Sequence, residues 1–155
     1  MDSLDCLNQV AEFHRTFKHP ILPTPQIPTE ERCRLRVSLI AEELKELEEA
    51  IEAKDIVGVA DALADIQYVL SGAVLEFGLG DRFRALFDEV QRSNMSKACR
   101  NLEEAEATVA HFKAKDVDCY FKEDNGKYLV YRTSDHKTLK SIFYSPANLE
   151  RILLG

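Results

Sequence analysis

The spacing of apolar residues along the chain predicts five helical segments followed by a mixed tail. The first segment, about residues 4–17, repeats apolar side chains every three to four positions, which is the spacing of one helix face. Four of the five prolines lie between His19 and Pro28. Proline lacks a backbone donor and restricts the residue before it, so we expect an extended loop there.

Two longer helices follow, over about residues 29–53 and 56–77. Thr29 suits the N-cap of the first because its hydroxyl accepts a hydrogen bond from a free backbone N–H. Gly78 and Gly80 are expected to end the second. A short turn at Asp55 joins the two helices, so they are predicted to lie antiparallel.

Two further helices are predicted over about residues 82–97 and 101–115, the last capped by Asn101. After them the periodicity changes to that of short strands, over about residues 117–122 and 127–132. Asn125-Gly126 between these strands is a hairpin turn signal. Ser145-Pro146 leads into a short terminal helix that ends near Leu153. We expect one domain over residues 1–155, with a helical core over about 3–115 and a tail over about 116–155.

Carboxylates interrupt the apolar pattern of the second helix. One stripe is apolar throughout and is expected to be core: Ile40, Leu44, Leu47 and Ile51. A second stripe begins with Leu35 and Leu39 and continues as Glu42 and Glu46, and Glu43 lies between the two stripes. Unpaired charges at the edge of a packed face are costly, so these acids are candidates for a functional site. Glu48, Glu49 and Glu52 are interpreted as a solvated face.

The third helix is apolar on most sides, yet Asp61 and Asp65 lie one turn apart on it. Such aspartates need compensation, either by a bound cation or by ion pairs with Arg32 or Arg36. Side chains that offer only oxygen suit hard cations such as magnesium or manganese. A di-iron bundle would require Glu-x-x-His motifs, and none of the four histidines follows a glutamate at that spacing.

Composition narrows the class of partner. The 155 residues carry a net charge of −7 and show no basic face, which disfavours nucleic acid. No apolar run approaches the about 20 residues of a membrane span, and the first residues do not resemble a signal peptide. The four cysteines are far apart in the sequence, which indicates reduced thiols rather than a zinc site. We therefore expect a cytoplasmic protein that contacts neither nucleic acid nor membrane.

These residues resemble the all-alpha NTP pyrophosphohydrolase superfamily, in particular its MazG-like and phosphoribosyl-ATP pyrophosphohydrolase-like branch. Glu42-Glu43-x-x-Glu46 matches the E-E-x-x-E motif of that superfamily. Its second motif, E-x-x-D, is altered: Asp65 matches the final aspartate, but Ala62 stands where the glutamate is usual, and Asp61 is the available substitute. The segment Arg92-Ser93-Asn94-Met95-Ser96-Lys97 also resembles this branch.

The resemblance implies an all-α fold, a MazG-like helical bundle that dimerisation completes, with a small C-terminal β-hairpin appendage. It implies hydrolysis of a nucleoside triphosphate to the monophosphate and pyrophosphate, with Mg²⁺ as cofactor and Mn²⁺ as a substitute. A homodimer or tetramer is expected. The catalytic and metal-binding candidates are Glu42, Glu43, Glu46, Asp61 and Asp65. The substrate-binding candidates are Asn94, Lys97, Arg36 and His14.

Several roles remain alternatives at this point. Lys97 and Asn94 would otherwise be ordinary residues of a helix end, and Arg32 and Arg36 would otherwise form intrahelical pairs. His14 and the Pro20–Pro28 loop are candidates for the wall of a base pocket, and Tyr68 is expected to be core. The protein is expected to act in nucleotide-pool housecleaning. The competing hypotheses are a phosphoribosyl-ATP pyrophosphohydrolase and a helical interaction protein whose acids are structural.

Overall fold

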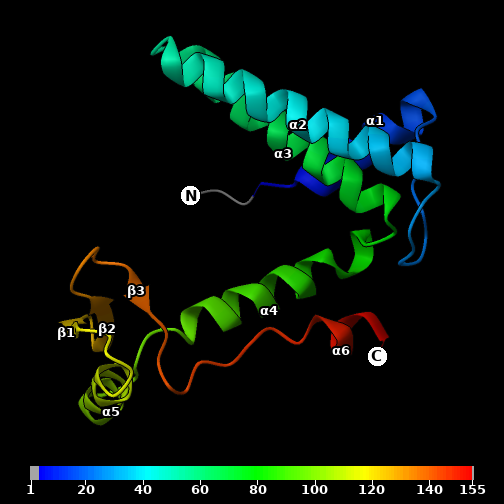
Figure 1. The fold of residues 1–155 in the computed structure, drawn as a ribbon. Coiled ribbons are helices and arrows are strands. Elements are labelled where there is room, and N and C mark those ends of the chain that lie inside the picture. Colours follow the sequence, from blue (N-terminus) through cyan, green and yellow to red (C-terminus); the bar gives the residue numbers. More distant parts are fainter. Residues whose placement is uncertain (1–3, 155) are drawn as a thin grey trace. The chain divides into compact units, whose positions relative to one another are not determined.

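The computed structural model describes residues 4–154. The chain divides into two compact units, Met1–Phe83 and Arg84–Gly155. The first unit holds three helices, α1 (Cys6–Phe17), α2 (Glu30–Glu52) and α3 (Ile56–Glu76), and the short 3-10 helix η1 (Gly80–Arg82) (Figure 1). The second unit holds α4 (Phe83–Met95), α5 (Leu102–Lys113), α6 (Leu149–Leu154) and a three-stranded sheet. The predicted helical class is therefore confirmed, together with the small β appendage.

Local signals set the ends of α2 and α3 as predicted. The hydroxyl of Thr29 accepts a hydrogen bond from the Arg32 N–H at 3.5 Å, and the Asp55 carboxylate accepts one from the Val57 N–H at 3.0 Å. At the far end of α3, Gly78 has φ of +67°, and a Cβ there would lie 1.9 Å from the Thr24 carbonyl oxygen. Only glycine fits this position, so it ends the helix.

The first unit buries one end of α3 and leaves the other open. Its buried apolar cluster consists of Val10, Ala11 and Leu75. The 19–28 loop is tied to the same end of α3, because Leu22 N–H donates to the Leu75 carbonyl at 3.0 Å and Gln26 N–H donates to the Phe77 carbonyl at 3.1 Å. The core of this unit therefore lies where α1, the loop and the last turns of α3 meet.

The expected core stripe of α2 is wrong for this chain on its own. Leu44 and Ile51 are 50% and 58% exposed, and Leu63 on α3 is 52% exposed. Periodicity identifies the residues that share a helix face, but it does not show whether another element covers that face. Here α2 and α3 pack on each other and leave an apolar surface toward solvent.

Helix α3 is also the one described helix that is long and apolar enough to cross a membrane, by length and composition only. By this criterion the expectation that no segment approaches a membrane span does not hold. The core helix of a soluble protein passes the same test, and α3 carries Asp61, Asp65 and Glu76, which are costly inside a bilayer. The criterion alone is weak evidence for a membrane.

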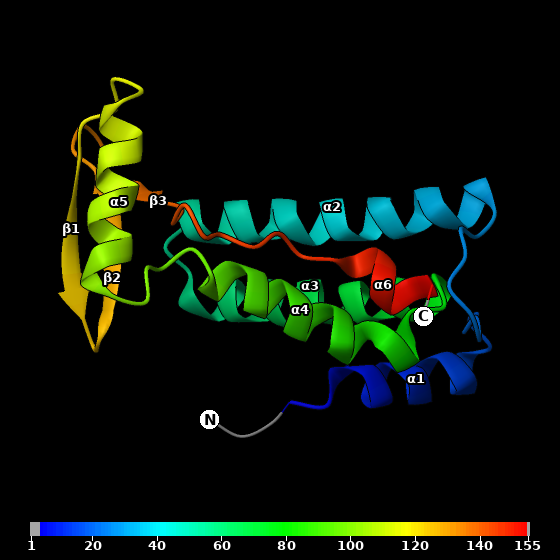
Figure 2. The same cartoon turned by 90° about the horizontal axis from the view of Figure 1, so that it is seen from below.

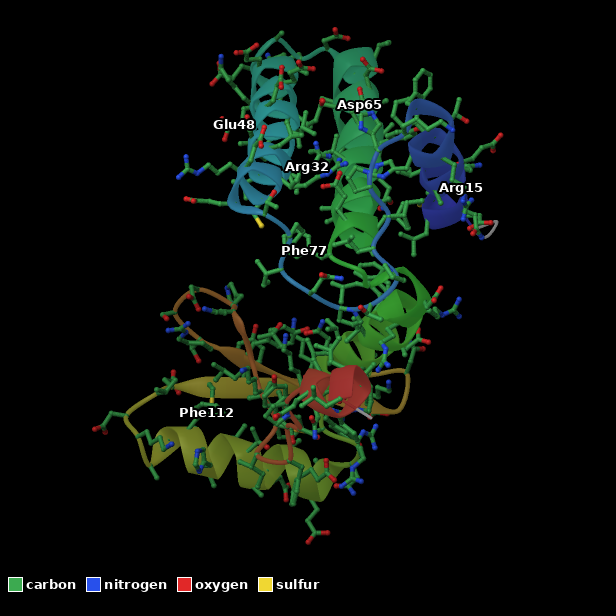
Figure 3. The ribbon with its side chains drawn as sticks, turned by 90° about the vertical axis from the view of Figure 1, so that its right-hand side faces the viewer. Arg15, Arg32, Glu48, Asp65, Phe77 and Phe112 are labelled. Carbon is green, nitrogen blue, oxygen red and sulfur yellow. The ribbon has the colours of Figure 1, made fainter. Side chains whose placement is uncertain are left out.

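The second unit packs α5 against an antiparallel sheet with the order β1-β2-β3 (Figure 2). Strands β1 (Cys119–Asp124) and β2 (Lys127–Arg132) pair from Asp124 opposite Lys127, and the turn residues Asn125 and Gly126 have φ of 50° and 74°. Positive φ at both turn positions is the geometry that Asn-Gly favours. The short strand β3 (Thr138–Leu139) was not predicted. Cys99, Ala105, Cys119 and Val130 form the buried cluster, and Phe112 points from α5 into it (Figure 3).

Candidate active site

Helices α2 and α3 bring together the five candidate carboxylates. The 53–55 turn reverses the chain, so that the second half of α2 lies beside the first half of α3 (Figure 1). Burial raises the pKa of Glu43 above its usual value, and the negative charges of Glu46, Asp65, Glu42 and Asp61 raise it further. All four other acids therefore lie close enough to Glu43 to repel its charge.

No basic side chain neutralises this cluster. Within residues 4–154, none of the five carboxylates forms an ion pair. Lys45, a basic residue on the same helix, pairs instead with Glu49 at 3.3 Å. The pairing of Asp61 or Asp65 with Arg32 or Arg36, which the sequence left open, does not form. Glu48 is exposed and points away from α3 (Figure 3), in agreement with its interpretation as part of a solvated face.

The donor set fits a hard cation. One carboxylate oxygen of Glu43, Oε2, is buried and has no hydrogen-bond partner, a costly state that a bound cation would relieve. All five groups offer oxygen only, as magnesium prefers. In the described part of the chain no three such side chains already converge at metal-ligand spacing. Mutual repulsion keeps uncompensated carboxylates apart, and four of the five are exposed and free to move.

Arg32 and Arg36 of α2 instead bind Glu76, near the end of α3. Arg32 Nε donates to Glu76 Oε2 at 3.1 Å, and the Nη2 atoms of Arg32 and Arg36 both contact Glu76 Oε1. Burial raises the pKa of Glu76, but these hydrogen bonds and charges outweigh it and lower the pKa overall. Glu76 is 1% exposed. Sequence reasoning missed this acid, although a single glutamate among buried apolar residues is a signal that a partner is required.

His14 belongs to the same buried network. Its Nδ1 lies 2.9 Å from the Pro20 carbonyl oxygen, and its Nε2 lies 3.3 Å from Arg36 Nη2. Burial is the main reason that the pKa of His14 is lowered. A Cβ on Gly72 would lie 2.6 Å from Arg36 Nη1, so the missing side chain makes room for the network. His14, a candidate for the wall of a base pocket, is buried, and both of its ring nitrogens have a partner.

An apolar cavity of about 230 Å³ borders this network within the first unit. It is lined by aromatic and aliphatic side chains, among them Phe13, His19, Leu35, Leu39, Tyr68 and Val69. Leu39 and Tyr68 each stand three residues from a candidate carboxylate, Glu42 and Asp65, so the cavity lies about one helical turn from the acids on both helices. Tyr68 is 40% exposed and meets Phe13 edge to face at 5.7 Å between centroids, so it is not the core residue expected.

The remaining candidates, Asn94 and Lys97, belong to the second unit. They lie at the end of α4 and just beyond it, where Lys97 Nζ donates to Asn94 Oδ1 at 2.7 Å. A cavity of about 560 Å³ in this unit is lined by three basic residues. Two of them, Arg92 and Arg100, pair with Glu89 and Glu104. This cavity holds no acid cluster, so we place the candidate metal site at the carboxylates.

Comparison with known proteins identifies a family for most of the helical part of the chain. The model of the family described as phosphoribosyl-ATP pyrophosphohydrolase matches residues 10–94, a span that includes all five carboxylates, His14, Arg36 and Asn94. An uncharacterized protein of Acanthamoeba polyphaga mimivirus, L479, is 24% identical and aligns with 93% of this chain and 94% of its own length.

Proposed function

The chain belongs to the phosphoribosyl-ATP pyrophosphohydrolase family, whose model matches more than half of it, and it is therefore a pyrophosphohydrolase of the all-alpha superfamily. On that premise we propose that it hydrolyses nucleoside triphosphates to the monophosphate and pyrophosphate, with magnesium as cofactor. The observation that carries the proposal is the group of five carboxylates with no basic partner, around the unpartnered Glu43 oxygen.

Glu43, Glu46 and Asp65 are the residues that would hold the metal, and Glu42 and Asp61 complete the set. Bound magnesium would neutralise the charge of the phosphate oxygens, which is the main requirement of phosphoryl transfer. The carboxylate of Glu42 or Asp61 would accept the proton of the attacking water. The negative cluster by itself repels a polyphosphate, so activity without a divalent cation is not expected.

The apolar cavity beside the acids supports a nucleotide substrate. Its aromatic side chains, Phe13, His19 and Tyr68, suit the flat face of a base. Because the cavity lies about one turn from the acids on both helices, a nucleotide with its base there would extend its phosphates toward them. His14 forms part of the cavity wall and holds Arg36 in place, and Arg36 acts by stabilising this wall rather than by direct contact with phosphate.

A second copy of the chain is the proposed cover for the exposed apolar surface of the first unit. Val37, Leu44, Ile51, Ile56, Val57 and Leu63 are each at least half exposed. Apolar exposure on this scale is typical of an interface. The proposed homodimer, which a tetramer would extend, agrees with the helical bundle that the family resemblance implies.

The substrate test is pyrophosphate release from a panel of ribo- and deoxyribonucleoside triphosphates and phosphoribosyl-ATP, with magnesium, manganese or chelator. We expect magnesium-dependent release from triphosphates, with manganese as a substitute. Turnover confined to phosphoribosyl-ATP would instead favour the second candidate, which the family description supports. If the folded protein turned over no substrate with either metal, the enzymatic proposal would be contradicted in favour of a structural role for the acids.

A further inference from the structure

The segment after the sheet, residues 140–148, is held along α4 by hydrogen bonds and is called the tail strap here. Ser141 N–H donates to the Lys97 carbonyl at 2.9 Å, and Ser145 N–H donates to Ser96 Oγ at 2.9 Å. Asn148 N–H donates to Glu89 Oε1 at 2.8 Å. These contacts lie within the second unit and fix the strap residue by residue against the last turns of α4 and the residues just after it (Figure 2).

The strap brings a second lysine and a tyrosine to the end of α4. Lys140 Nζ lies 4.2 Å from the centroid of the Tyr144 ring, and the Tyr144 hydroxyl accepts a hydrogen bond from Ser93 Oγ at 3.3 Å. That hydrogen bond and the positive charges of Lys140 and Lys97 lower the pKa of Tyr144, against burial, which raises it. Both ammonium groups therefore act on the same hydroxyl.

No carboxylate balances these two cations. In the described residues neither Lys97 nor Lys140 forms an ion pair. Glu89, which holds the strap at Asn148, is already bound by Arg92 Nε at 2.7 Å. Two like charges near one group repel each other, and the hydrogen bond from Ser141 N–H to the Lys97 carbonyl keeps the backbones of the two lysines close. A bound anion would relieve that repulsion.

The unused hydrogen-bonding groups of this cluster are donors. Lys97 donates one N–H to the Asn94 side-chain oxygen and has two further N–H donors. The Asn94 amide nitrogen has no partner among the described residues. Tyr144 already accepts from Ser93, so its own O–H proton is available to donate outward. Ammonium, amide and phenol donors without a competing acceptor match a group that carries several anionic oxygens.

We propose that Lys97, Lys140, Asn94 and the Tyr144 hydroxyl form a binding site for a phosphate-bearing anion of the pyrophosphate class. This site rests on the proposed function only in the choice of pyrophosphate as the bound anion, since that group is part of the proposed substrate and is also a product. Lys140 and Tyr144 are the residues that this inference adds. Their place in the chain, 43 or more positions after Lys97, hides the cluster from motif reading.

The test is calorimetric titration of pyrophosphate into the full-length protein in chelator, where no metal takes part and no turnover occurs. We expect Lys140→Met to weaken pyrophosphate binding about tenfold and Tyr144→Phe to weaken it a few-fold, since each removes a hydrogen bond to a charged group. Lys140→Arg should keep most of the affinity. The matched control is Lys137→Met, a change of the same charge at an exposed lysine of the same unit.

Equal binding by the wild type and Lys140→Met, with an unchanged melting temperature, would overturn the site. An equal loss in Lys137→Met would overturn it too, because the affinity would then reflect overall charge alone. The outcome is separable from the proposed function. Lys140-dependent pyrophosphate binding by a protein that hydrolyses no nucleotide would keep the site and remove the enzyme. Nucleotide hydrolysis by the wild type, together with unaffected pyrophosphate binding in Lys140→Met, would keep the enzyme and remove the site.

Discussion

Helices α2 and α3 carry two clusters of charge that differ in one respect, the presence of a partner. Toward one end, Arg32 and Arg36 of α2 both pair with Glu76 of α3, which is only 1% exposed. Toward the turn, Glu43 and four further acids meet without a cation. The same pair of helices therefore builds one cluster whose charges have partners of opposite sign and one cluster whose charges have none.

The contrast shows how to assign a role to a buried or half-buried charge. A charge with a partner of opposite sign contributes to the fold, and breaking the pair leaves the other member unpaired. A group of like charges costs stability in the free protein, so its presence requires a ligand to explain it. We expect changes in the two clusters to have opposite consequences for activity and stability.

The largest effect is expected from the unpaired cluster. Asp65→Asn or Glu46→Gln should lower turnover about a thousandfold, because metal-ion catalysis supplies several kcal/mol. Unfolding of the metal-free protein should stay unchanged or shift to higher temperature, since one repulsive charge is gone. Glu48→Gln is the matched control and should leave both quantities unchanged. A marked loss of metal-free stability in Asp65→Asn would place this aspartate in a structural role.

The paired cluster should respond in the opposite way. Glu76→Gln removes the negative charge that holds two arginines, and breaking a buried pair costs about 3–5 kcal/mol. Chemical denaturation should show that loss without magnesium present. Glu30→Gln, which removes the exposed partner of Arg34, is the comparison and should cost less than about 0.5 kcal/mol. Similar denaturation curves for the two variants would remove the distinction between the clusters.

Magnesium should stabilise the protein through the unpaired cluster alone. At a hundred times its dissociation constant, a ligand that binds only the folded state adds about 2.7 kcal/mol. Thermal unfolding with and without magnesium should show this gain in the wild type and in Lys137→Met, and not in Glu46→Gln. A gain of equal size in Glu46→Gln would mean that magnesium binds elsewhere.

Lowering the pH should affect metal binding and stability at different pH values, with smaller effects than the substitutions. Because the pKa of Glu43 is raised, it takes up a proton first as pH falls, and magnesium binding should weaken while the fold persists. The pKa values of Glu76 and Glu89 are lowered, that of Glu89 to about 2, so the stability they contribute is present above about pH 4.5 and is lost as pH falls through their folded values. Magnesium titrations and unfolding midpoints measured over the same pH range test this order. Loss of magnesium binding and of the fold at the same pH would contradict it.

Local signals in the sequence predicted much of the fold. The caps at Thr29 and Asn101 and the turns at Asp55 and Asn125-Gly126 act through neighbouring backbone, so a few residues are enough to predict them. The two-residue strand β3 has no such signal, because it exists only through its pairing with β2. The exposure of apolar side chains could not be predicted from the sequence either. Leu44 and Val74 both occupy apolar stripes, and only the surrounding elements decide that one is exposed and the other buried.

The sequence likewise predicted one part of the candidate site and left the other part open. The five acids follow from helical spacing and the short turn, because two antiparallel helices must bring them together. The pairing of Arg32 and Arg36 with Glu76 spans 40 or more positions and depends on which helix faces meet, so the sequence left several partners open. The cluster at Lys140 and Tyr144 depends on a strap that follows an irregular path, and no periodicity describes such a path.

The central claim is that the unpaired acids hold magnesium for cleavage between the α and β phosphates of a nucleotide. Phosphorus NMR of a nucleoside triphosphate, incubated with the wild-type protein and magnesium, tests it most directly because it identifies the bond that breaks. We predict signals of monophosphate and pyrophosphate, their absence in chelator, and their absence with Asp65→Asn. Signals of diphosphate and orthophosphate, or equal product formation by Asp65→Asn, would contradict the account.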